Sequence, residues 1–464
     1  MSTYELGRQP VHLASPAAAL AASGIEVTLL DLAVEAWDPS LLDGVDGVAF
    51  SVPMHTAMRL AIPMAGTIRA LRPELPIAFY GLYAAVGSER TLDGLAHALI
   101  VGEYEPDLVA WARGLGRHER VIPEIKRHLG RSTFHTPHRL NLPSHDNYAQ
   151  LEWEGVARVA GAVEASHGCR HRCRHCPIPV VYDGRMRVVG SEKVLADIDQ
   201  LASDGVEHVT FGDADFLNAP RYSLDLLREA HAAHPDLTFD VTVKVEHILA
   251  HESLWPEMAS LGLLFAVSAF ESTDDATLEI LDKNHTAGDM ARAVTVLRSA
   301  DVHIRPTWLP FVPWTKPQHL VDLVGFLDRN HLWSATDPVQ LAIKLLIPEG
   351  SLLETHHAVV PHLSSYEPQS LTWSWVFEHP DTGRLYKALD AVAAEGSDCG
   401  AEAADTLAMM RDRIGEVAGA HFEAMPESAP TPRLSESWFC CAEPTAAQAA
   451  AVGLTIGRVP LAST

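Results

Sequence analysis

Residues 165–177 read ASHGCRHRCRHCP, which places Cys169, Cys173 and Cys176 in a CxxxCxxC spacing. Three thiolates on one short loop can hold three irons of a four-iron four-sulfur cluster, and the fourth iron then has no protein ligand. An open metal position is typical of catalytic rather than structural sites. The spacing therefore predicts a cluster that binds a small molecule at its open iron.

This spacing resembles the signature of the radical S-adenosylmethionine (SAM) superfamily. The resemblance implies that the open iron chelates the amino and carboxylate groups of SAM. It also implies that SAM is cleaved to a 5′-deoxyadenosyl radical. We therefore expect an iron–sulfur-dependent enzyme with SAM as a second cofactor, a small-molecule substrate and a reducing partner such as flavodoxin or ferredoxin.

Zinc is the main alternative for these cysteines, with His167, His171 or His175 as a fourth ligand. Structural zinc sites usually combine ligand pairs from two separate places in a chain, and no second pair follows at a suitable distance. Half of the six cysteines lie within eight positions, so a chance grouping of buried thiols is a weak explanation. The cluster remains the favoured interpretation.

Length and composition indicate a globular protein of two or three domains, with 464 residues, 47% hydrophobic and 20% charged. The formal net charge of -25 argues against a nucleic-acid partner, because no basic surplus replaces condensed counterions. The N-terminus lacks a signal-peptide pattern, and no apolar run is long enough to span a membrane. These features predict a cytoplasmic protein without a membrane partner, in agreement with thiols that bind metal.

The fold class predicted for residues 156–355 is α/β, a partial TIM-type barrel of about six βα units. A helix is expected near 192–202. Apolar segments typical of buried parallel strands alternate with helical patterns. The expected strands lie near 156–164, 209–211, 238–243, 263–268, 302–307 and 340–346.

Polar residues follow these strands at their carboxyl ends, where parallel α/β folds bind ligands. By resemblance to the superfamily, Gly212 and Asp213 would contact the amino group of SAM, and Ser268 and Glu271 its ribose and methionine part. His175 would pack against the cluster or the adenine. A helix N-cap or a surface turn is the alternative for Glu271.

Residues 1–120 are expected to form a doubly wound, Rossmann-type domain, with strands at 27–30, 47–52 and 77–80. The unit resembles the cobalamin-binding domain that precedes many radical enzymes. The ligand motif DxHxxG is absent, and His55 is interpreted as a polar surface residue, so cobalamin is possible without support from a ligand motif. The chain opens on what resembles the loop after a missing strand, and we expect that the start codon was assigned late.

Residues 121–155 are predicted to be a linker, and residues 356–464 a helical C-terminal extension. Its tail reads CCAEP from Cys440 and resembles that of a radical SAM subgroup named for a CCAEP or, with selenocysteine, a CUAEP tail. Adjacent Cα atoms lie about 3.8 Å apart, too close for a relaxed disulfide. Cys440 and Cys441 are therefore candidate catalytic residues that bind a soft atom or exchange thiols. A tail with incidental thiols is the alternative, and Cys399 is interpreted as a small buried residue.

The sequence as a whole predicts a radical SAM enzyme acting on an unidentified substrate, with a sulfur, selenium or arsenic centre as one candidate. Two alternatives stay open. The first is a cobalamin-dependent radical methyltransferase, and the second is a non-enzymatic protein that binds a metal or metalloid.

Overall fold

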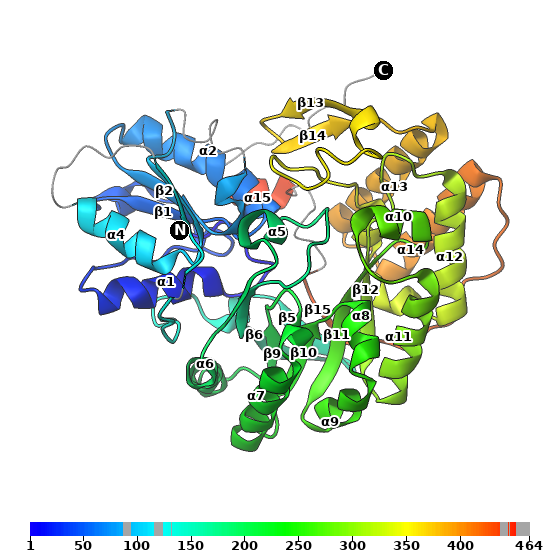
Figure 1. Ribbon diagram of the computed structural model, residues 1–464, viewed down its shortest axis with the longest axis horizontal. Coiled ribbons are helices and arrows are strands. Elements are labelled where there is room, and N and C mark those ends of the chain that lie inside the picture. Colours follow the sequence, from blue (N-terminus) through cyan, green and yellow to red (C-terminus); the bar gives the residue numbers. More distant parts are fainter. Residues whose placement is uncertain (87–93, 116–123, 131, 437–443, 445, 452–464) are drawn as a thin grey trace. The chain divides into compact units, whose positions relative to one another are not determined.

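The computed structural model describes residues 1–86, 94–115, 124–130, 132–436, 444 and 446–451, and it separates into two compact units (Figure 1). The first unit consists mainly of Met1–Tyr148. The second consists of Ala149–Tyr366 and Thr372–Phe439. Each unit is built around its own sheet, so each is considered by itself.

The sheet of the first unit has the order β1-β2-β3-β4, and all its described pairings are parallel. Parallel neighbours need crossover connections. Helix α2 lies in the connection from β1 to β2, and α4 lies in the connection from β3 to β4. This order runs in one direction. The parallel bridges of Ser2 to Ser51 and to Asp31 extend the sheet on the other side of β1, which gives the reversal of the doubly wound arrangement that the sequence predicted. The strands are β1 (Val48–Ser51), β2 (Ile77–Tyr80), β3 (Ala98–Gly102) and β4 (Glu124–His128), and the helices are α1 (Val11–Ala22), η1 (Pro39–Leu42), α2 (His55–Leu71), η2 (Leu82–Ala85) and α4 (Glu105–Leu115).

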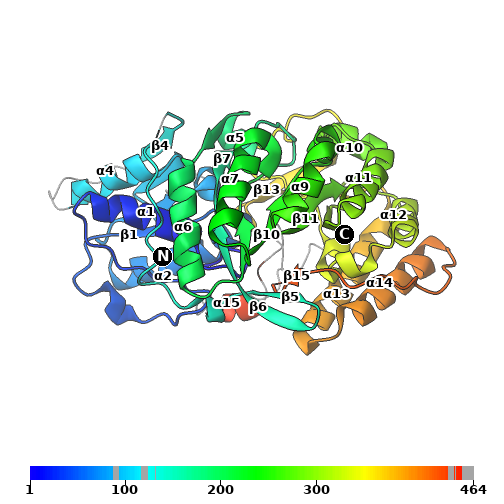
Figure 2. The same cartoon turned by 90° about the horizontal axis from the view of Figure 1, so that it is seen from below.

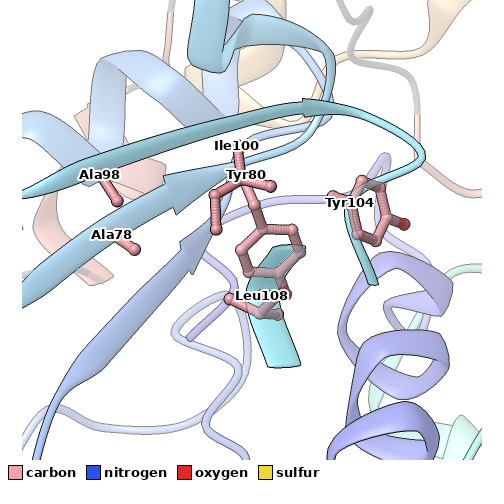
Figure 3. Packing of buried hydrophobic residues seen from close by; sticks show 6 residues of the cluster. All are labelled: Ala78, Tyr80, Ala98, Ile100, Tyr104 and Leu108. Atoms are coloured by element: carbon pink, nitrogen blue, oxygen red, sulfur yellow. The ribbon is translucent and has the colours of Figure 1, made fainter. Parts of the chain in front are cut away.

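A buried cluster joins this sheet to Tyr104 and to Leu108 of α4, and Figure 3 shows its side chains. Alternate residues of a strand point to the same face, which is why Tyr80 and Ile100 belong to one cluster with small alanines before them. The ring of Tyr80 lies 5.1 Å from that of Tyr104, and its hydroxyl donates to the carbonyl oxygen of His12 in α1 at 2.9 Å. The cluster consists of Ala78, Tyr80, Ala98, Ile100, Tyr104 and Leu108.

The strand expected over 27–30 does not form. The N–H of Ser2 donates to Leu30 and its carbonyl accepts from Leu32, both at 2.9 Å, and Ser2 also makes a bridge with Ser51. Among the described residues, the only pairing near this segment is therefore a single-residue bridge between Ser2 and Asp31. The bridge lies one residue beyond the expected strand, and residues 27–30 themselves belong to no strand.

The sheet of the second unit is the predicted partial barrel. Its described strands run β12-β11-β10-β9-β6 in parallel, and β5 and β15 extend it in antiparallel pairings. The strands are β5 (Gln150–Trp153), β6 (Val156–Val163), β9 (His208–Phe211), β10 (Thr238–Thr242), β11 (Leu263–Glu271), β12 (His303–Trp308) and β15 (Arg433–Leu434).

Helices follow the strands of this sheet in the βα order, and Figure 2 shows them along its outer face. The expected helix near 192–202 is α6, from Ser191 to Ser203. The helices are α6, α7 (Pro220–Ala233), α8 (Val245–Ala250), η5 (Glu252–Leu254), α9 (Trp255–Ser260), α10 (Asp275–Leu281), α11 (Ala287–Ser299) and α12 (Pro317–Asn330), with the short turn η4 (Phe216–Asn218) after β9.

The sixth barrel strand expected over 340–346 is wrong. This segment begins as the 3₁₀ helix η7 (Pro338–Ala342), and only Lys344 then bridges to Phe311. Pro310 and Pro313 flank Phe311, and proline has no N–H to continue a ladder. The described parallel part of the barrel therefore has five strands and one isolated bridge.

The predicted helical stretch after the barrel consists of α13 (Pro380–Cys399) and α14 (Ala403–Ala418), which pack against each other. Cys399, interpreted from sequence as buried, is exposed because it is the last residue of α13. Within the described ranges, no helix is long and apolar enough to cross a membrane. The remaining elements are η3 (His145–Asn147), β7 (Ser166–Gly168), α5 (Ile178–Tyr182), β8 (Met186–Val188), η6 (Trp333–Ala335), η8 (Val360–His362), β13 (Leu363–Glu367), β14 (Thr372–Trp375) and α15 (Ala446–Ala451).

Candidate functional site

The cysteine loop leaves the carboxyl end of the barrel strand β6 through the short strand β7, which pairs with β8. Gly168 closes this pair with φ +76°, a backbone conformation that favours glycine. A Cβ at Gly168 would lie 2.4 Å from the carbonyl oxygen of Arg185 and 2.7 Å from the ring of Tyr182. The glycine before the first cysteine is thus required by close packing of the loop on itself.

Two interactions with α10 fix the middle of the loop. The N–H of Arg174 donates to the carbonyl oxygen of Leu281 at 2.9 Å, and its guanidinium donates to that of Ile280 at 2.8 Å. A cation near the last carbonyls of a helix also complements the helix dipole. The arginine between the second and third cysteines therefore ties the loop to the barrel.

The three cysteines are free thiols, with Cys169 and Cys173 buried and Cys176 half-buried. Burial raises the pKa of Cys169 and of Cys176, and the neighbouring thiol charges raise both further. Asn218 opposes this rise in the pKa of Cys169 by donating to its sulfur at 3.5 Å. Thiolates crowded in this way need a cationic metal centre for stability, so the donor set fits a cluster with three protein-bound irons.

Glu271 ends β11 within reach of the cysteine loop. Its Oε1 lies 3.0 Å from His175 Nε2 and accepts a hydrogen bond from Lys283 at 3.1 Å. Burial alone would raise the pKa of Glu271, but Lys283 and His175 outweigh burial and hold that pKa well below its usual range. Glu271 is therefore an anion held in place beside the loop, and the imidazole of His175 contacts its carboxylate rather than solvent.

A bulge aims this carboxylate. The β11–β12 register shifts between Ala269 and Glu271, and Glu271 has φ +65°, which is uncommon for a residue with a side chain. Such backbone strain is typical of functional positions. The alternative reading of Glu271 as a helix N-cap does not apply, because α10 is capped by Asp274.

Gly212 and Asp213 follow β9, but they differ in burial and in hydrogen bonding. Gly212 is exposed, and its N–H continues the sheet by donating to Val163 at 2.8 Å. Asp213 is buried, and its carboxylate accepts from the N–H of Ala165 at 2.9 Å and from the hydroxyl of Ser166 at 2.5 Å. Burial raises the pKa of Asp213 to about 6 despite these bonds. Asp213 thus orients the start of the cysteine loop, whereas Gly212 lies beside Glu164, whose side chain would be 3.3 Å from a Cβ at this position.

Ser268 lies on the other face of β11 from Val267 and Ala269, since side chains alternate along a strand. It shares that face with Phe270, whose ring packs 6.2 Å from that of Phe326 in α12. Ser268 is fully buried on the helix-covered face. The structure therefore does not bring Ser268 together with Glu271.

Asn218 and Lys283 belong to this site but were not selected from the sequence. Both come after an element that the sequence did identify. A single asparagine or lysine at such a place, however, forms no motif with a recognisable spacing. Cys440 and Cys441 lie outside the described residues.

His55 in the first unit is buried rather than a surface residue, because it is the first residue of α2 and its ring packs edge-on to Tyr83 at 5.9 Å. Gly81 follows β2 with φ +112°, and a Cβ there would lie 3.2 Å from the backbone of Val52. The other histidine near this edge, His12, pairs with Glu5 at 3.1 Å. These residues lie near a sheet edge of the kind that binds ligands.

Residues 163–324 match the model of the Radical SAM superfamily. The chain carries a radical SAM domain. The matched range contains all three loop cysteines as well as Gly212, Asp213, Ser268 and Glu271. The expectation of an iron–sulfur-dependent enzyme that uses a four-iron four-sulfur cluster and SAM is thereby confirmed, and it replaces the alternative of a non-enzymatic metal-binding protein.

Two curated proteins are similar to this radical SAM chain. Hopanoid C-3 methylase of Methylococcus capsulatus is 22% identical over 326 residues, which cover 65% of this chain and 62% of that protein. Hopanoid C-2 methylase of Rhodopseudomonas palustris is 27% identical over 170 residues, which cover 36% and 32%. The chain thus spans less than two thirds of the length of either relative.

Solved structures extend the likeness to the fold outside the radical SAM domain. The cobalamin-dependent SAM radical enzyme OxsB, with aqua-cobalamin bound, matches with a TM-score of 0.63 at 13% identity and covers 85% of this chain and 65% of its own. The radical SAM methyltransferase TsrM from Kitasatospora setae matches with a TM-score of 0.50 at 18% identity, covering 70% and 69%. At these identities the likeness concerns the fold, and it confirms the predicted fold class.

Proposed function

We propose that this protein cleaves SAM reductively at a cluster held by Cys169, Cys173 and Cys176 and directs the resulting radical at a small-molecule substrate. The observation that carries the proposal is the packed loop of three thiols beside the fixed anion Glu271. A bound four-iron four-sulfur cluster would supply the electron for the cleavage of SAM. We place this chemistry in residues 156–355.

The protein's own residues would bind and orient SAM around the loop. Glu271 stays ionised and would accept hydrogen bonds from ribose hydroxyls or the ammonium group, which are its natural donors. Gly212 is exposed at the strand end and would contact SAM through its backbone. Asp213 would act indirectly, by holding Ala165 and Ser166 at the root of the loop.

The reductant and the substrate belong to the proposal as well. A low-potential electron carrier such as flavodoxin or ferredoxin would deliver the electron. Cys440 and Cys441 would bind a soft substrate atom or restore a thiol after turnover, since neighbouring thiols suit sulfur, selenium or arsenic centres. Replacing both with serine should abolish product while SAM cleavage continues; an unchanged product yield would remove the tail from the mechanism.

The direct test is anaerobic reconstitution with iron and sulfide, followed by reductant and SAM. We expect 5′-deoxyadenosine to form in the wild type. Failure to form it from a chain that contains a full cluster, with and without candidate substrates, would contradict the proposal.

A second candidate is methyl transfer with cobalamin as an additional cofactor. The likeness of the first unit's fold to OxsB, together with the similarity to two methylases, favours it. Cobalamin should then copurify with the chain when it is supplied during expression, and visible absorption would detect it at one per chain. If the chain stays free of cobalamin after reconstitution, methyl transfer from cobalamin is contradicted and only SAM cleavage remains proposed.

A further inference from the structure

Three side chains that no sequence motif connects meet in the second unit beside the cysteine loop. His171 comes from the loop, Asp215 follows β9 and His247 lies in α8. One ligand atom from each, namely Nε2, Oδ2 and Nδ1, lies within 4.8 Å of the others. Asp215 is buried, and the two histidines are mostly buried.

The three atoms approach one another within ion-pair distance but make no hydrogen bond among the described residues. Asp215 Oδ2 is 2.8 Å from His247 Nδ1 and 3.7 Å from His171 Nε2. All three atoms are nevertheless buried and without a partner in hydrogen-bonding geometry among the described residues. Buried polar atoms left in this state cost free energy, so a group of three that face one another points to a missing ligand.

The surroundings hold these side chains as they would hold metal ligands. Asp215 Oδ1 accepts from the N–H of Leu217 at 3.1 Å, which directs Oδ2 towards the imidazoles. His171 Nδ1 lies 3.8 Å from Glu246, and a carboxylate behind a ligating histidine is a common arrangement at metal sites. The rings of His171 and His247 meet edge to face at 4.8 Å.

We propose that His171, Asp215 and His247 bind a divalent transition metal ion, zinc or iron(II), separate from the cluster. Two imidazoles and one carboxylate are a donor set that both metals accept, and they leave a coordination position open. Ligand bonds of about 2.0–2.2 Å place neighbouring donors roughly 3.3 Å apart in a tetrahedron, so small side-chain rotations suffice. The ion would cross-link the cysteine loop to the ends of β9 and β10, and its open position would face a ligand there.

Zinc is the probe for the test. Cluster-loaded wild-type protein, freed of loose metal with a chelator, is dialysed against Zn²⁺ without oxygen, and iron and zinc per chain are measured. We expect one zinc ion per chain. His247→Ala should lower the affinity for zinc by about 100-fold or more, and Glu246→Gln should lower it by about 10-fold, in line with the cost of losing supporting groups. The matched control is His251→Ala, because His251 lies beside His247 but outside the trio and should keep the zinc. Equal zinc in the two histidine variants would overturn the proposal.

X-ray absorption at the zinc edge of the wild type gives an answer that needs no variant. Nitrogen and oxygen neighbours near 2.0–2.2 Å are expected, without sulfur near 2.3 Å. A sulfur shell would show that zinc sits on cysteines instead and would also overturn the proposal. Neither readout depends on SAM cleavage, so failure of this site and failure of the proposed function are separate results.

Discussion

The two ends of the strand pair β9–β10 carry the same kinds of polar side chain, but these are hydrogen-bonded to one another at one end and not at the other. At the amino end, His208, Thr210 and Thr238 surround Asp240 in a closed network. Asp240 Oδ1 lies 2.9 Å from His208 Nε2 and accepts from Thr210 at 2.5 Å, and the other imidazole nitrogen lies 2.8 Å from Thr238. At the carboxyl end, Asp215 and two histidines lie together without such bonds.

The difference teaches how to tell stabilising from functional polar residues. Buried polar groups normally satisfy one another, so the closed end is what a folded interior looks like. The open end departs from that rule on the side where βα folds bind ligands. Residue type alone does not distinguish the two ends, since both combine histidine with aspartate.

The largest effect is expected at the open end, in the cysteine loop. The Cys169, Cys173, Cys176→Ala triple variant should lose the cluster and cleave SAM at background level, because no other described cysteine can replace these ligands. Iron content and 5′-deoxyadenosine are the measurements. Cys399→Ala is the control, since this exposed thiol lies at the end of α13 and both quantities should be unchanged. Iron retained at wild-type level by the triple variant would contradict the cluster assignment.

A matched pair of aspartate variants tests the comparison directly. Asp240→Ala leaves His208 buried without its carboxylate and should lower the free energy of unfolding by about 3–5 kcal/mol. Asp215→Ala removes the cap on Leu217 and the contacts with His171 and His247, which lack hydrogen-bonding geometry, and should cost about 1 kcal/mol. Denaturant unfolding of the cluster-free chains measures both. Equal losses would show that the two ends do not differ in the way proposed.

Glu271→Gln sharpens the account of the open end. The amide keeps the shape but loses the charge that Lys283 and His175 neutralise, so SAM binding should weaken by about 10–100-fold, the range of one charge-assisted hydrogen bond. Glu279→Gln is the control because Glu279 is exposed on α10. SAM affinity unchanged at full iron content would remove Glu271 from the binding site.

Lys344 is a half-buried charge that belongs to neither end. Its Nζ lies 4.2 Å from the ring centre of Trp375 and 5.7 Å from those of Phe377 and Tyr386. Burial lowers the pKa of Lys344 to about 8 from 10.5. The cost of a shift of this size is about 3 kcal/mol, which attraction to the aromatic rings should reduce to about 1–2 kcal/mol.

The sign of the pH effect follows from that lowered pKa. Below about pH 8 the lysine is charged in both states, so the folded state carries the full cost. Between about 8 and 10.5 the unfolded chain binds more protons, and stability rises with pH. Lys344→Met should therefore be more stable than wild type at pH 7, with the advantage vanishing near pH 10.5. A constant difference in unfolding free energy across this range would contradict the assignment.

The fold could be predicted from sequence wherever periodicity and punctuation were strong. The strands β6, β9, β10, β11 and β12 and the helix α6 agree with their patterns, because apolar strands between helices have few other ways to bury their surface. The segments 27–30 and 340–346 have equally good strand patterns. They fail because a strand also needs a partner ladder, which one bridge at Ser2 and a proline-flanked Phe311 do not supply.

The sequence by itself determined the cysteine spacing and with it the expectation of a radical SAM domain, because residues on one loop are close in the chain and leave a local signature. Only the tertiary structure decided which side chains meet that loop. Glu271 is aimed by a bulge, Ser268 is turned to the helix-covered face by strand alternation, and Asp215 and His247 join His171 across 76 positions of sequence. Contacts between distant residues depend on register and strand ends, and a linear pattern does not record these.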